Sequence, residues 1–126
     1  LGSAASKHQG GEMAVVNHQQ RWIQKGVSQT IWDSLLNGDT GRPQSGASLP
    51  DKNVQVSGTF GAGGSVNIRG SNDDVSYFTL TDPQGNALVF TAAGMEQIAE
   101  NPRYISPEVT AGDGSTDLTV TIIAKG

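Results

Sequence analysis

The second half of the chain alternates between apolar and polar residues, which is the pattern of half-buried β-strands. Segments 52–60 and 116–124 show this alternation most clearly. In each segment the apolar positions fall on one face of an extended strand: Val54, Val56, Gly58 and Phe60 in the first, and Leu118, Val120, Ile122 and Ala124 in the second. We therefore expect these positions to face a common core.

Turn-forming sequences separate the predicted strands. GAGG (61–64) leads from segment 52–60 into SVNIRG (65–70), with Val66 and Ile68 inward, so the two segments are predicted to pair as a hairpin. ALVFTA (87–92) predicts a further strand, with Leu88 and Phe90 on one side. Other turns are expected at SNDD (71–74), DPQGN (82–86) and AGDGS (111–115).

Two segments late in the chain are less regular. GMEQIAE (94–100) predicts a single helical turn that is ended by Pro102. RYISPEV (103–109) predicts an extended path. Because proline cannot donate a hydrogen bond to a neighbouring strand, Pro107 is expected at a sheet edge or at a bulge.

Residues 14–36 fit two periodicities. Apolar residues at helical spacing favour a helix, whereas Gly26 and the β-branched residues that follow it oppose one. A strand over about 27–35 is the alternative, with Ser28, Thr30, Trp32 and Ser34 on one face and Val27, Gln29, Ile31 and Asp33 on the other. We favour the strand because the rest of the chain has β patterning.

These elements predict an all-β protein. The expected architecture is an antiparallel β-sandwich, similar to a jelly roll, of roughly seven or eight short strands. Residues 14–126 are expected to form a single domain, and residues 1–13 an extended N-terminal arm or a tag remnant. The turn-rich segment 37–51 predicts a long loop, which in a compact domain is often a functional surface.

Composition excludes several classes of function. The net charge is −4, and the eight basic residues are scattered singly, so the clustered basic stripe of a nucleic-acid-binding protein is missing. Cysteine is absent, which removes disulfides and thiolate chemistry. No run of apolar residues is long enough to span a membrane, and the first twelve residues do not have the pattern of a signal peptide.

Candidate chemistry is sparse. GTFGAGGS (58–65) has the glycines of a phosphate-binding loop but lacks the Lys-Ser/Thr pair and the following helix. The acidic residues lie in turns, without the spacing of a calcium loop. Neither His8 nor His18 has the neighbours of a catalytic or zinc-binding histidine. We therefore expect no catalytic residues, no metal site, no cofactor and no enzymatic activity.

Several large aromatic residues fall outside the predicted core: Trp22, Trp32, Tyr77, Phe78 and Tyr104. Exposed aromatic side chains can stack on sugar rings, which keeps a carbohydrate-binding module as one hypothesis. The alternative is that Trp22 and Trp32 fill the sandwich or a subunit contact, where aromatic residues are enriched.

From Met13 onward the sequence is similar to small structural proteins encoded beside the capsid genes of tailed bacteriophages and prophages. The similarity is carried by short motifs along the chain: AVVNHQ (14–19), NGDTG (37–41), PDK (50–52), VQV (54–56), GTFG (58–61), LTDPQGNAL (80–88), FTAAG (90–94) and PRYI (102–105). The resemblance implies a virion structural protein, and specifically a decoration, or cement, protein on the capsid surface.

That resemblance implies partners and a location. The expected partners are the major capsid protein and neighbouring copies of this chain, which alone would be monomeric or weakly trimeric. The protein would be made in the cytoplasm of the bacterial host and act in the virion, stabilising the expanded shell. The arm (1–13), the segment around Trp22 and Trp32 and the loop 37–51 are expected to contact the partner, because the core does not use them. The residues expected at this contact are Trp22, Ile23, Trp32, Asp39, Arg42, Pro43 and Leu49.

Two other functions remain open at this stage. One is a head–tail or tail adaptor, which copy number per virion would distinguish from a decoration protein. The other is a carbohydrate-binding module for host surface glycans.

Overall fold

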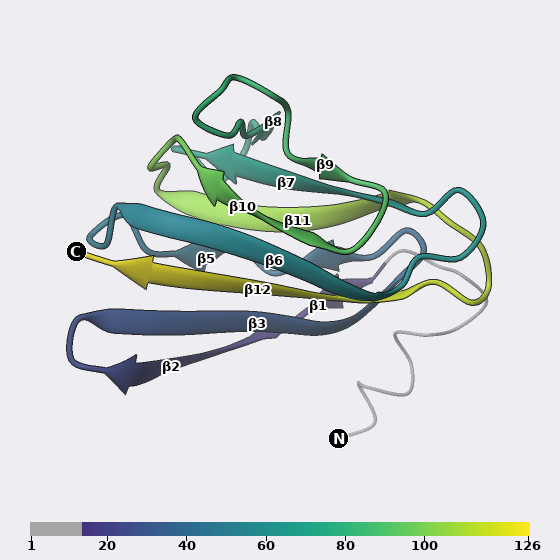
Figure 1. Ribbon diagram of the computed structural model, residues 1–126, viewed down its shortest axis with the longest axis horizontal. Coiled ribbons are helices and arrows are strands. Elements are labelled where there is room, and N and C mark those ends of the chain that lie inside the picture. The colour runs from purple at the N-terminus through teal and green to yellow at the C-terminus, as the bar shows by residue number, and fades with distance from the viewer. Residues whose placement is uncertain (1–13) are drawn as a thin grey trace.

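The computed structural model describes residues 14–126, which form two β-sheets packed face to face, with no helix among them (Figure 1). The predicted all-β sandwich is confirmed. Most strand pairs are antiparallel, and the pair formed by β1 and β4 is parallel. The predicted N-terminal arm lies outside the described residues.

One sheet has five strands in the order β10-β6-β12-β3-β2. Four of the five are long, and β2 and β10 are its edges. The bounds are β2 His18–Gln24, β3 Val27–Leu36, β6 Asp51–Thr59, β10 Gly94–Ile98 and β12 Asp117–Lys125.

The other sheet has seven strands, five of them only two residues long. Its main path is β1-β4-β11-β7-β8, and β5 pairs with β11 while β9 pairs with β7. The bounds are β1 Val15–Val16, β4 Thr40–Gly41, β5 Gln44–Ser45, β7 Ser65–Ser71, β8 Phe78–Thr79, β9 Val89–Phe90 and β11 Tyr104–Ala111.

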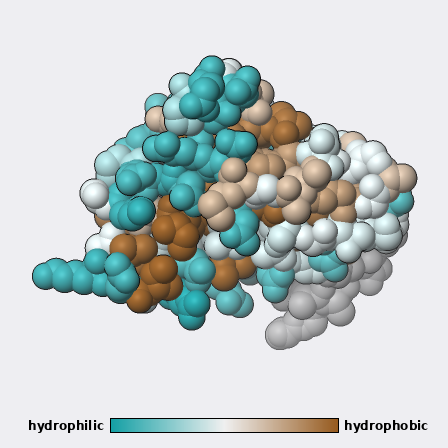
Figure 2. Space-filling view, viewed as in Figure 1, coloured by the Kyte–Doolittle hydropathy of each residue, from teal (hydrophilic) through white to brown (hydrophobic). Residues whose placement is uncertain are grey.

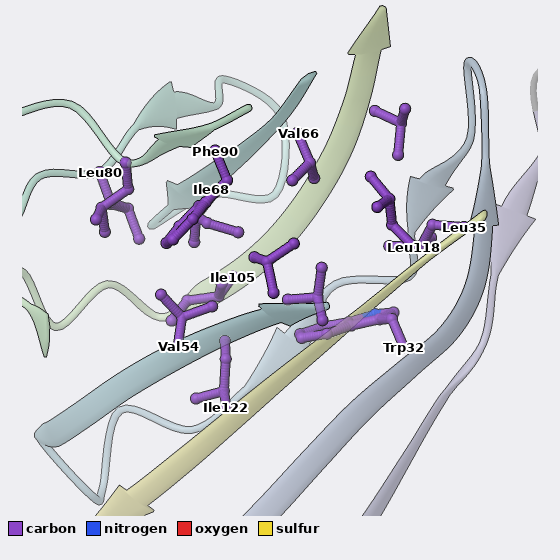
Figure 3. Close-up of a cluster of buried hydrophobic side chains, with 14 of the residues drawn as sticks. Trp32, Leu35, Val54, Val66, Ile68, Leu80, Phe90, Ile105, Leu118 and Ile122 are labelled. Atoms are coloured by element: carbon purple, nitrogen blue, oxygen red, sulfur yellow. The ribbon is translucent and has the colours of Figure 1, made fainter. Parts of the chain in front are cut away.

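The core lies between the two sheets and is filled from both, as Figure 3 shows. Val54, Leu118 and Ile122 come from the five-stranded sheet, whereas Val66 and Ile68 come from the other, and all are fully buried. All four predicted inward positions of segment 116–124 are buried, whereas in segment 52–60 Val54 and Val56 are buried, Phe60 is partly buried and Gly58 is exposed. Leu88 and Phe90 are buried as well, as expected.

The strand predicted over 27–35 is confirmed as β3, and its faces are correct as far as Trp32. Ser28, Thr30 and Trp32 are buried. At Ser34 the backbone takes a positive φ of 60°, and the pairing with β12 shifts between Leu35 and Trp32. This bulge puts Leu35, rather than Ser34, in the core.

The predicted hairpin between segments 52–60 and 65–70 is wrong. β6 pairs with β10 and β12, whereas β7 pairs with β11, β8 and β9 in the opposite sheet. The glycine-rich turn therefore carries the chain across the sandwich, with Gly61 and Gly63 at positive φ. Alternation shows which side chains point inward, but not which strand lies alongside.

Three further expectations are corrected. Segment 94–100 is not a helical turn, because residues 94–98 form β10. The 37–51 loop contains two short strands that pair with β11, so it is part of the sandwich. Pro107 lies inside β11, a central strand, and not at a sheet edge or a bulge. It pairs with Ile68 of β7 on one side, and on the other side it falls between β5 and β4, so that neither of these strands pairs with it.

Candidate functional site

The outer edge of the five-stranded sheet exposes apolar side chains. Within residues 14–126, β2 pairs only with β3. Trp22 is 67% exposed and Ile23 is 44% exposed, and Ile23 lies where the β2–β3 register shifts beside the turn at Gly26. Figure 2 shows hydrophobic atoms gathered over this end of the hairpin. We call Trp22 and Ile23 the β2 surface.

Polar contacts fasten β2 to its neighbour and leave the β2 surface uncovered. Arg21 Nε donates a hydrogen bond to Gln29 Oε1 at 2.9 Å, and Gln20 Nε2 donates one to Ser28 Oγ at 3.2 Å. The His18 ring packs edge-on against Trp32, with 5.6 Å between ring centroids. β2 is thus fastened to β3 on both faces of the sheet, by Arg21 on the outer face and by Gln20 and His18 on the inner face.

Two residues expected at a partner contact belong to the interior instead. Trp32 is fully buried, and its Nε1 donates a hydrogen bond to the Arg42 carbonyl at 2.9 Å. Asp39 is 1% exposed, and its Oδ2 accepts the Leu36 amide at 2.9 Å. Neither side chain is therefore available at the surface, because Trp32 packs in the core and Asp39 closes the turn after β3.

Arg42 and Pro43 lie near the start of β2. Arg42 is exposed, and its Nε donates a hydrogen bond to Asn17 Oδ1 at 2.5 Å. Burial lowers the pKa of His18, a hydrogen bond with the Pro43 backbone opposes this, and the positive charge of Arg42 lowers the pKa further.

Leu49 is half-buried near the C-terminal Gly126, so the structure does not gather all the predicted contact residues into one surface.

A pocket of about 490 Å³ opens beside β8. This strand lies on the opposite side of the sandwich from β2 (Figure 1). Two segments that are distant in the sequence form its walls, one from residue 70 to 80 and one from 100 to 102. Its lining residues are Gly70, Ser71, Asn72, Asp73, Ser76, Phe78, Thr79, Leu80, Glu100, Asn101 and Pro102. We call this the β8 pocket.

Hydrogen bonds fix the first wall of the β8 pocket. Ser71 Oγ accepts the Asp74 amide at 2.9 Å and donates to Asp73 Oδ1 at 2.8 Å. The same Asp73 oxygen accepts the amides of Val75 and Ser76, both at 2.9 Å. The bonds from the Ser76 and Val75 amides lower the pKa of Asp73. This carboxylate is therefore ionised at neutral pH.

The second wall is fixed in the same way. Glu100 accepts hydrogen bonds from the Thr81 amide at 2.9 Å and from the Thr81 hydroxyl at 2.5 Å. Burial raises the pKa of Glu100, but these bonds outweigh it and the pKa is lowered. Asn101 accepts a hydrogen bond from the buried Lys52 ammonium and donates one to the Ala47 carbonyl at 2.8 Å.

Sequence patterns identified only part of this pocket. Phe78 stands out as an aromatic residue outside the core pattern, and it is indeed 72% exposed. Glu100, Asn101 and Pro102 carry no such signal, because their role depends on the close approach of β7 and the segment between β10 and β11. Gly70 permits this approach, since an added Cβ would lie 2.6 Å from Pro102 and 2.7 Å from Leu80.

Other classes of site have little support in the part of the chain that the structure describes. Between residues 14 and 126, no three His, Cys, Asp or Glu side chains are grouped so that they could hold a metal ion. The same residues include no helix suited to crossing a membrane. The acidic residues of the turns instead bind nearby backbone amides, as Asp113 does with Ala62 and Ser115, both at 2.9 Å.

No protein-family model matches this sequence. No curated protein matches it either. Among solved structures, the SPBc2 prophage-derived protein YomS aligns over 84% of this chain and 100% of its own, with a TM-score of 0.56 and 10% identity. The chain therefore shares its fold with a prophage-derived protein.

Two further structures align less well. Peruvianin-I, a cysteine peptidase from Thevetia peruviana latex, has a TM-score of 0.39 and 14% identity over 79% of this chain and 49% of its own. KdgF from Halomonas sp. has a TM-score of 0.36 and 11% identity over 86% of this chain and 87% of its own.

Proposed function

We propose that this chain is a virion structural protein of a tailed bacteriophage, and that it decorates the capsid by binding the major capsid protein through the β2 surface. The observation that carries the proposal is the exposed Trp22 and Ile23 pair on an outer strand. Aromatic residues are enriched at protein interfaces, and tryptophan often contributes a large share of the binding energy. The resemblance of the sequence to phage structural proteins and the fold shared with the prophage-derived YomS support the virion assignment.

The charge distribution favours one kind of partner surface. The protein as a whole is acidic, with a net charge of −4, but Arg21 and Lys25 are the charged residues of the β2 hairpin edge from 18 to 26. A local basic patch on an acidic protein orients the molecule toward a neutral or acidic surface. The major capsid protein would present such a surface at each decoration site, and neighbouring copies would add contacts between themselves.

Binding to capsids tests the proposal. Purified protein is mixed with expanded capsids that lack it, and bound protein is measured by co-sedimentation together with the melting temperature of the shell. We expect saturable binding at hundreds of copies per particle, as the repetition of a capsid lattice requires, and a higher shell melting temperature. Saturation at about a dozen copies or fewer would instead identify an adaptor at a single vertex.

A pair of variants locates the contact. Trp22→Ala should weaken capsid binding by at least roughly tenfold, because an exposed aromatic anchor is removed. Phe78→Ala is the matched control, since Phe78 is equally aromatic and 72% exposed but lies at the opposite side of the sandwich. An absence of binding, or equal binding by wild type and Trp22→Ala, would contradict the proposal.

A further inference from the structure

We propose that the β8 pocket is a second binding site, independent of the capsid contact, and that its ligand is a neutral saccharide unit of a glycan. The proposal combines the shape of the pocket, the exposed aromatic ring on its wall and the nature of its polar side chains. Its volume of about 490 Å³ lies within the range of small-ligand pockets. That space suits one or two sugar rings.

The apolar part of the pocket suits the C–H face of a sugar ring. Phe78, Leu80 and Pro102 line it together. Leu80 is buried beneath the surface, whereas Phe78 is 72% exposed although it lies in a strand paired to β7. An aromatic ring held by a strand, but left without cover, offers a flat apolar surface at little cost in side-chain entropy.

The polar part suits hydroxyl groups. The carboxylates of Asp73 and Glu100 accept hydrogen bonds and lie on opposite walls. Asn72 Oδ1 accepts a hydrogen bond from the Arg103 amide at 3.0 Å, and the Asn72 side-chain nitrogen donates no hydrogen bond within residues 14–126. The pocket therefore offers both acceptors and a donor, as recognition of a hydroxyl group requires.

Charge excludes acidic ligands. Among residues 14–126, no lysine, arginine or histidine lines the pocket, whereas two carboxylates do. A sialylated or phosphorylated sugar would therefore bring a negative charge next to Asp73 and Glu100, and like charges at short range are unfavourable. A neutral hexose or N-acetylhexosamine does not meet this repulsion.

The pocket is formed before a ligand arrives. The hydrogen bonds of Ser71 and Asp73 fix one wall, and the bonds between Glu100 and Thr81 and between Asn101 and Lys52 fix the other. A rigid site loses less entropy on binding than a flexible loop does. This fastening distinguishes the β8 pocket from an accidental surface hollow.

A glycan array provides the first test. Wild-type protein is applied to printed neutral oligosaccharides and to their sialylated and phosphorylated counterparts, and the strongest neutral glycan is then titrated into ¹⁵N-labelled protein. We expect binding to neutral glycans only, with amide shifts centred on residues 70–80 and 100–102. Absence of binding to every neutral glycan, preference for the acidic glycans, or shifts centred elsewhere would overturn the proposal.

The same two variants used for the capsid contact separate the sites. Phe78→Ala should lower glycan affinity by roughly tenfold, because the stacking surface is lost. Trp22→Ala should leave it unchanged, and a thermal melt checks that both variants are folded. Equal glycan affinity for Phe78→Ala and wild type would also overturn the proposal, whatever the outcome of the capsid experiment.

Discussion

The exposed aromatic residues on the two sides of this sandwich have different surroundings. At the β2 edge, a long strand has one strand neighbour within residues 14–126 and presents Trp22 and Ile23 without a surrounding wall. At the β8 side, the exposed Phe78 stands in a pocket whose two walls are each held by side-chain hydrogen bonds. An open strand edge suits a large, flat partner, whereas a walled pocket suits a small ligand.

This difference matters because both sides carry an exposed aromatic residue. Exposure alone therefore does not indicate what binds. The kind of ligand is indicated by what surrounds the aromatic ring. Trp22 has neighbours along one strand, whereas polar groups from two segments converge around Phe78. The following predictions test whether the two sides are built as differently as the contacts indicate.

The largest effect is expected directly beneath the β2 edge. Trp32→Ala should lower the free energy of unfolding by about 3–5 kcal/mol, because it opens a cavity in the core and removes the hydrogen bond to the Arg42 carbonyl. Trp22→Ala is the matched control and should change it by less than about 0.5 kcal/mol. Urea unfolding followed by circular dichroism measures both. Similar losses for the two variants would mean that the β2 surface supports the fold rather than a partner.

A smaller effect is expected at the wall of the β8 pocket. Gly70→Ala should cost about 1–3 kcal/mol, because the added methyl group would lie 2.6 Å from Pro102 and 2.7 Å from Leu80. Gly114→Ala serves as control, since no atom lies within 4 Å of its added Cβ. Thermal unfolding of both variants tests this. If Gly70→Ala is as stable as wild type, the two walls are not in close contact.

The sequence predicted the fold better than the sites, for a physical reason. Alternation shows which residues of a strand share a face, so the core positions of β12 were correctly predicted, and so were the two faces of β3 up to the bulge at Ser34, although Trp32 was expected outside the core. It does not specify the partner strand, and β6 and β7 were wrongly paired. β10 was missed because, as an exposed edge strand, it buries only Ile98.

The sites depend on which distant segments meet. Trp22 and Ile23 were identified as contact candidates, and both are exposed, but Trp32 has similar sequence surroundings and lies in the core. The β8 pocket was not anticipated, because Asp73 and Glu100 are brought together only by the pairing of strands. Local patterns contain no information on that pairing.

The smallest effect concerns Lys52, which connects the core to the pocket wall. This lysine is 1% exposed, and its ammonium contacts Asn101. Burial lowers its pKa below the ordinary 10.5, because the charged form loses hydration. The unfolded chain therefore binds this proton more tightly than the folded chain does. It follows that stability rises with pH between the folded-state pKa and 10.5, and that the full penalty applies below that range.

Lys52→Met removes both the charge and its pH dependence. We expect the variant to be more stable than wild type by ~1 kcal/mol at pH 7, with the difference shrinking as the pH approaches 10.5, because wild type then becomes neutral at this position. Urea unfolding of both proteins from pH 7 to pH 10.5 measures the difference, and groups common to both cancel. A variant that is less stable at pH 7 would show that the bond to Asn101 outweighs the cost of burying the charge. In that case the Lys52–Asn101 bond would be a net stabilising link between the pocket wall and the core.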